Sequence, residues 1–64
     1  MSNIRNCLAA LDFEEMPETE QEVVDRCNAK MEKHKDSTES DRLARQLLRE
    51  NRDMCIAEMR RRRT

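Results

Sequence analysis

The chain has 64 residues, 42% of which are charged, only one aromatic residue, and a formal net charge of −1. We expect a single small domain, 1–64, whose core supplies no more than roughly 3–5 kcal/mol. No stretch approaches the roughly 20 apolar residues of a membrane span, so no membrane partner is expected. Self-association would bury faces that such a small chain leaves in water, and we therefore expect a homodimer or higher oligomer.

Residues that favour turns and strands are scarce. Glycine is absent and Pro17 is the only proline, so tight hairpins that require positive φ are hard to build. The composition therefore predicts an all-α fold. Three widely spaced cysteines, Cys7, Cys27 and Cys55, do not form a disulfide framework and fit reduced thiols in a cytoplasmic protein. No signal peptide is expected at the N-terminus.

Apolar spacing predicts a short first helix over residues 3–13. Its apolar residues recur at i, i+3, i+4 and i+7, which places them on one helix face: Ile4, Cys7, Leu8 and Leu11. A helix of this length is marginal alone and needs a larger partner.

A second helix is predicted over residues 18–35. Pro17 suits a first helical turn, and Thr19 followed by Glu22 has the pattern of a capping box. The apolar stripe of this helix ends near His34 and consists of Val23, Val24, Cys27 and Met31.

The third predicted helix, residues 38–62, is the longest. Two overlapping capping boxes precede it, one from Asp36 to Glu39 and one from Thr38 to Asp41, and no helix breaker follows. The second and third helices form a predicted helical hairpin with the short helix before it. We expect oligomerisation to complete this hairpin as a helical bundle with coiled-coil-like packing.

The third helix has two distinct sides. At 100° per residue, a candidate core or oligomer face spans an arc of about 160°. Its members are Leu43, Leu47, Leu48, Asn51, Met54, Cys55 and Met59. A candidate basic interaction face spans about 80° and comprises Arg42, Arg45, Arg49, Arg52, Arg60 and Arg63, with Ile56 as an apolar interruption. A buried Asn51 would fix register and oligomer state, whereas an exposed one at the seam would not.

Charge is unevenly distributed along the chain. Residues 1–25 contain seven acids and one base, whereas residues 26–64 contain seven acids and twelve bases. Antiparallel packing of the second and third helices would place Arg60–Arg63 beside the acids of Glu14–Glu22 and neutralise them internally. Alternatively, the arginines bind the phosphates of a nucleic acid, although the absence of stacking aromatics and a pI near 5.8 argue against this. A third possibility is that they form a docking surface for an acidic protein.

Catalytic and metal-binding patterns are not evident. Cys27 and His34 share a helix face but rise about 10.5 Å from each other, so they cannot bind one ion. The neighbouring carboxylates Glu18 and Glu22 lack an expected pocket that would separate their pKa values. We expect no enzyme activity, no cofactor, no metal and no small-molecule substrate.

The sequence therefore predicts a regulatory protein–protein interaction module that acts through amphipathic helices. Its expected partners are a second copy of itself and another protein, and methionines on the apolar faces suit an adaptable surface. The alternative is a nucleic-acid-binding regulatory protein that uses the arginine stripe and the C-terminal arginines.

Overall fold

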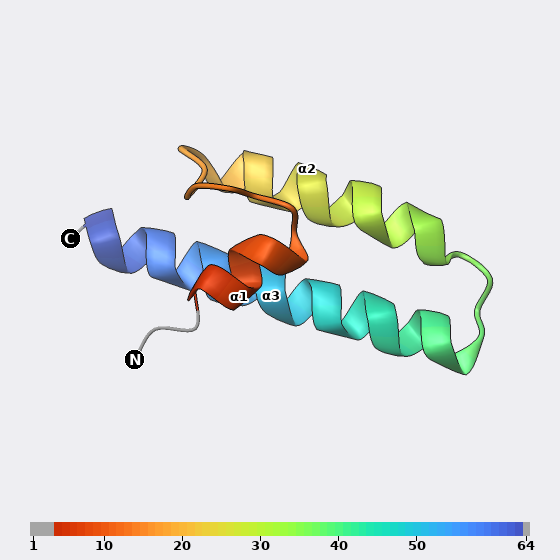
Figure 1. The fold of residues 1–64 in the computed structure, drawn as a ribbon. Coiled ribbons are helices and arrows are strands. Elements are labelled where there is room, and N and C mark those ends of the chain that lie inside the picture. Colours follow the sequence, from red (N-terminus) through yellow and green to blue (C-terminus); the bar gives the residue numbers. More distant parts are fainter. Residues whose placement is uncertain (1–3, 64) are drawn as a thin grey trace.

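The computed structural model describes residues 4–63, which form three α-helices and one 3₁₀ turn (Figure 1). Helix α1 spans Ile4–Ala10, and α2 spans Glu20–Met31 and continues into the turn η1, Glu32–His34. Helix α3 spans Glu39–Arg63. Residues 4–63 contain no strand, so the prediction of an all-α fold is confirmed. Residue 3, the first of the predicted first helix, lies outside the described residues.

Helix α1 ends three residues before its predicted end because the chain turns sharply at Asp12. Asp12 has φ of 59°, the left-handed conformation that glycine usually supplies after a helix. The amide of Asp12 donates to Ala9 O at 3.0 Å, and the amide of Phe13 donates to Leu8 O at 2.8 Å. This pair of bonds is a Schellman motif, which stops the helix and directs Phe13 back towards the core.

Helix α2 begins at Glu20 because Thr19 caps it. Thr19 Oγ1 accepts a hydrogen bond from the amide of Glu22 at 3.3 Å, and Glu22 Oε2 accepts one from the amide of Thr19 at 3.4 Å. The predicted capping box is therefore confirmed. At its other end α2 tightens into η1, and the α-helical part stops at Met31.

Helix α3 begins at Glu39, where one of the two predicted capping boxes supplies the cap. The amide of Asp41 donates to Thr38 Oγ1 at 3.1 Å. Ser37, with φ of 59°, makes the preceding reversal without glycine. From there α3 continues for 25 residues, or about 37 Å, without interruption.

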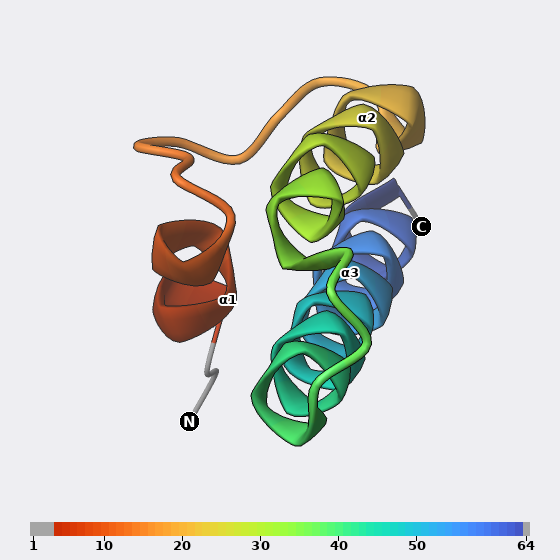
Figure 2. The same ribbon diagram turned by 90° about the vertical axis from the view of Figure 1, so that its right-hand side faces the viewer.

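Helices α2 and α3 form an antiparallel pair, and α1 packs against one side of it (Figures 1 and 2). All three helices supply core residues, and each contributes one cysteine. The buried apolar residues are Cys7, Leu11, Val23, Cys27, Cys55 and Met59. The seven residues of α1 extend only about 10 Å, so this helix covers part of the hairpin and leaves the end near η1 without a third helix. None of the helices in residues 4–63 combines the length and apolarity needed to cross a membrane.

Candidate interaction surfaces

The arginines of α3 divide into a central row and a C-terminal group. We call Arg42, Arg45, Arg49 and Arg52 the arginine row. Within the described residues, Arg42, Arg45 and Arg49 form no ion pair, and Arg52 Nε lies 3.1 Å from Oδ1 of the adjacent Asp53. Arg42 and Arg49 are exposed, whereas Arg45 and Arg52 are half-buried. The arginine row therefore keeps positive charge that only one neighbouring acid offsets.

The C-terminal arginines, by contrast, pair with acids of the same chain. Arg60 contacts Glu20 through two bonds, Nη2 to Oε1 at 3.1 Å and Nε to Oε2 at 3.3 Å. Arg63 Nη1 lies 3.5 Å from Glu20 Oε2. The Arg60 guanidinium lowers the pKa of Glu20, and Glu20 in turn raises the pKa of Arg60. The predicted internal pairing between the arginine tail and the acidic first third is confirmed for Arg60 and Arg63.

The predicted apolar face of α3 splits into a covered part and an uncovered part. Cys55 and Met59 are buried, and Leu48 packs against the core. Three other members lie outside the core, and we call them the apolar strip: Leu43, Leu47 and Met54, which are 56%, 57% and 46% exposed. The covered residues cannot serve as an interface in this conformation, so the strip is the candidate surface.

An apolar groove adjoins the strip where α1 ends. It has a volume of about 310 Å³ and lies between the last residue of α1, the end of α2 with η1, and the first half of α3. Its lining is Ala10, Lys30, Lys33, His34, Ala44, Leu47, Leu48 and Asn51. Leu47 belongs to both the strip and the groove, so together they form one continuous surface.

Asn51 and Ile56 are both half-buried, and only Ile56 differs from what helical spacing suggests. Asn51 is half-buried at the edge of the groove, and its Nδ2 donates to Leu47 O at 2.8 Å within the same helix. Ile56 is half-buried and packs against the core, so it is not an apolar anchor on an open basic surface. A substitution of Ile56 would therefore disturb the fold before it tested binding.

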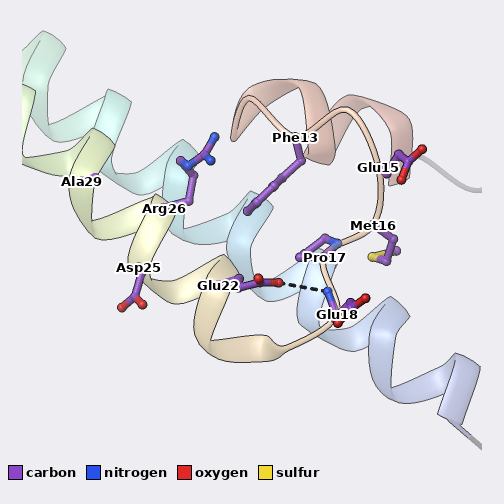
Figure 3. A pocket seen from close by; sticks show the side chains of 9 residues that line it. All are labelled: Phe13, Glu15, Met16, Pro17, Glu18, Glu22, Asp25, Arg26 and Ala29. Atoms are coloured by element: carbon purple, nitrogen blue, oxygen red, sulfur yellow. Dashed lines mark hydrogen bonds between the residues drawn. The ribbon is translucent and has the colours of Figure 1, made fainter.

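A second hollow, of about 600 Å³, lies between the linker after α1 and the outer side of α2 (Figure 3). Its lining is Phe13, Glu15, Met16, Pro17, Glu18, Glu22, Asp25, Arg26 and Ala29. The amide of Glu18 donates to Glu22 Oε2 at 3.0 Å, the bond drawn as a dashed line. Four of the lining residues are acids, so this surface is opposite in charge to the arginine row.

Arg26 holds the linker in place, a role that the sequence did not indicate. Its Nη1 donates to Leu11 O at 3.2 Å and to Asp12 O at 3.0 Å. Its guanidinium carbon also lies 4.7 Å from the centre of the Phe13 ring, a cation–π contact. Because these contacts join α2 to a turn 14 or more residues earlier, no local pattern could have revealed them.

The histidine and the cysteines, the residue types that could bind a metal or take part in catalysis, pair or pack within the fold. Within residues 4–63 there is no group of three or more His, Cys, Asp or Glu side chains placed to hold a metal ion. His34 Nδ1 lies 3.2 Å from Asp41 Oδ1 and so links η1 to α3. The three cysteines are free and buried, and burial raises the pKa of each thiol.

Comparison with family models, with curated proteins and with solved structures finds no match to this chain.

Proposed function

We propose that this chain is a non-enzymatic protein–protein interaction module that self-associates through the apolar strip and the adjoining groove. The observation that carries the proposal is the exposure of Leu43 and Leu47, both more than half exposed, beside an open groove. Full burial of a leucine side chain is worth about 1.5–3 kcal/mol, which is large compared with the stability of a core this small. A second copy that covers the strip would recover roughly half of that free energy at each leucine, since each is a little more than half exposed.

An antiparallel arrangement of two α3 helices suits the spacing of the strip. Leu43 and Met54 are separated by about 16 Å along the helix axis. With a two-fold axis near the middle of this interval, Leu43 of each copy would lie opposite Met54 of the other. The same patch then serves both copies, as in the usual isologous dimer. The result would be a bundle in which the second copy completes the uncovered half of the hairpin.

Two further features support an interaction role in the cytoplasm. The groove beside the strip and the hollow beside the linker are open surface depressions formed by helices and one linker. An open depression suits the docking of a partner better than it suits catalysis, which usually needs an enclosed cleft. All three cysteines are free, as expected in a reducing compartment. We therefore propose a cytoplasmic location together with the interaction function.

Self-association is tested by sedimentation velocity over a concentration series, with the wild type compared with Leu43→Gln/Leu47→Gln. Glutamine keeps helix propensity and net charge but removes the apolar surface. We expect the wild type to shift towards a larger species as concentration rises. The double variant should remain monomeric at the same concentrations and show an unchanged helical circular dichroism spectrum.

Ala29→Gln is the matched control, because Ala29 is an exposed apolar residue on the outer side of α2, away from the strip. It should associate as the wild type does. A wild type that stays monomeric at every concentration, or a double variant that associates as strongly as the control, would contradict the proposal.

A further inference from the structure

The arginine row stands out because three of its four members, Arg42, Arg45 and Arg49, form no ion pair in the described residues, whereas the other arginines of α2 and α3 have partners within the chain. Arg26 bonds to backbone carbonyls, Arg60 and Arg63 pair with Glu20, and Arg62 pairs with Glu58. We propose that the arginine row is a second docking surface, whose partner is an acidic α-helical segment of another protein. The inference rests on the proposed interaction function but concerns a different side of α3.

The position of the row separates it from the apolar strip. At 100° per residue, the centre of the row lies about 160° around α3 from Met54. Met54 faces α1, because its sulfur lies 3.7 Å from Cys7 Sγ. The row therefore faces away from α1 and borders α2 on the opposite side of the hairpin. Arg52 and Arg49 lie near enough to Cys27 of α2 to oppose the rise in its thiol pKa that burial causes, and Asp53 lies near enough to add to that rise.

The flank of α2 next to the row carries little charge. Arg26 and Lys30 mark the side of α2 that faces α1, because they contact Leu11 O and Asp12 respectively. Val24 and Asn28 lie on the other side of Cys27, about 60° and 100° further around the helix. Val24 is half-buried and Asn28 is exposed and neutral. A partner helix lying along the seam would therefore meet arginines on one side and the uncharged Val24 and Asn28 on the other, with the exposed acids Asp25 and Glu32 about 40–60° further around.

The spacing of the row matches that of acids on a helix. The intervals of three, four and three residues place successive arginines about 4.5, 6 and 4.5 Å apart along the axis, and the row is about 15 Å long. Glutamates at i, i+3, i+7 and i+10 of a partner helix have the same spacing and lie on one face. Arginine with carboxylate is a strong, directional pairing. Arg45 and Arg52 are half-buried, so part of their side-chain freedom is already lost before a partner binds.

A helix fits this surface better than a nucleic acid does. Exposed acids, Glu50 and Asp53, lie on the outer flank of the row, within about 80° of Arg42 around the helix. A duplex is wide enough to bring phosphates against both acids, whereas a single helix about 10 Å across can lie along Arg42, Arg45 and Arg49 on the side away from Glu50. The net charge of −1 also gives no long-range attraction for a polyanion, and no aromatic side chain lies in the row.

The test uses fluorescence anisotropy at low salt with the full chain. The probe is a labelled helical peptide of about 14 residues with glutamates at the 3-4-3 spacing, and the reference probe has glutamine at the same four positions. Duplex DNA and single-stranded RNA are measured beside them. We expect the glutamate peptide to bind, the glutamine peptide to bind at least tenfold more weakly, and the nucleic acids to bind more weakly than the glutamate peptide.

The variant Arg42→Gln/Arg45→Gln/Arg49→Gln should weaken binding of the glutamate peptide at least tenfold. Its control, Arg5→Gln/Lys35→Gln/Arg62→Gln, removes three exposed positive charges elsewhere and should change affinity by less than about twofold. Circular dichroism and sedimentation confirm that both variants keep the fold and the oligomeric state of the wild type.

Three results would overturn the inference. The first is that the glutamate peptide does not bind. The second is that the row variant and its control lose the same amount of affinity for that peptide. The third is that a nucleic acid binds more tightly than the glutamate peptide and that its binding depends on the arginine row. The Leu43→Gln/Leu47→Gln variant distinguishes failure of the inference about the arginine row from failure of the proposed self-association. That variant should lose self-association and still bind the peptide, while the row variant should lose the peptide and still self-associate.

Discussion

Each of the three helices contributes one cysteine to the interior. Cys7, Cys27 and Cys55 are at most 1% exposed, and Cys27 Sγ lies 3.4 Å from Leu48 O in the neighbouring helix. Burial raises the pKa of each thiol, so the thiolate is disfavoured as well as inaccessible. The cysteines therefore act as small apolar residues that allow the three helices to approach closely.

This environment predicts slow thiol chemistry in the native protein. We expect a thiol reagent at about pH 8 to label Cys7, Cys27 and Cys55 at least about 100-fold more slowly than in denaturant, since opening costs roughly 3 kcal/mol. Mass spectrometry with time resolves the three sites. Rapid labelling of one cysteine in native buffer would show that the helix carrying it is not packed as described.

Single residues of α3 also mark the limit of what the sequence reveals. Helical spacing assigned Cys55, Met59 and Leu48 to an apolar side, and these residues do pack in the core. Helical spacing could not reveal that only one part of this apolar side is buried in the core, because the buried part depends on where α1 packs against α3. Ile56, at the other edge, is half-buried because it packs against the core, although its spacing groups it with arginines.

At the scale of elements, local chemistry determined the helix starts better than the helix ends. Thr19 and Thr38 accept amide hydrogen bonds within their own first turns, so a short sequence pattern was enough to find them. The end of α1 depends on Asp12 in a left-handed conformation, and Asp12 is held by Lys30 Nζ at 2.7 Å. Such a contact between elements has no local signature.

The capping box at Thr19 can be tested directly. Thr19→Ala removes the acceptor for the Glu22 amide and should lower the free energy of unfolding by about 1 kcal/mol. Thr19→Ser keeps a hydroxyl at the cap and should lose much less. Urea denaturation followed by circular dichroism measures both variants, and equal stability of the alanine and serine variants would show that the cap contributes nothing.

At the scale of the whole molecule, ion pairs between elements fix how the helices meet. Glu20 at the start of α2 pairs with Arg60 and Arg63 at the end of α3, which suits the dipoles of both helices. Asp12 pairs with Lys30 and links the turn after α1 to α2. The charge asymmetry of the sequence predicted the first contact, and the pairing depends on the antiparallel arrangement that the hairpin loop imposes.

These pairs predict a loss of stability in acid. The pKa of Glu20 is lowered chiefly by its hydrogen bond to Arg60, the pKa of Asp12 by Lys30, and the pKa of Asp41 by Thr38. A carboxyl group with a lowered folded-state pKa stabilises the fold above its unfolded value of about 4. That contribution disappears as the pH falls through the lower folded-state value. The urea concentration at the midpoint of unfolding should therefore decrease as the pH is lowered from about 5 to about 2.

Glu20→Gln isolates the part of this acid-sensitive stability that comes from the ion pairs between α2 and α3. At pH 7 the variant should be less stable than the wild type, and the difference should narrow as the pH falls below about 4, because the wild type then loses the same ion pairs. Added salt should narrow the difference as well, since Arg60 and Arg63 are exposed to solvent and their ion pairs are screened. Glu39→Gln is the control, because Glu39 also lies in the first turn of a helix, is exposed and forms no ion pair within the described residues. A stability difference for Glu20→Gln that did not change with pH would mean that Arg60 and Arg63 do not hold the two helices together through charge.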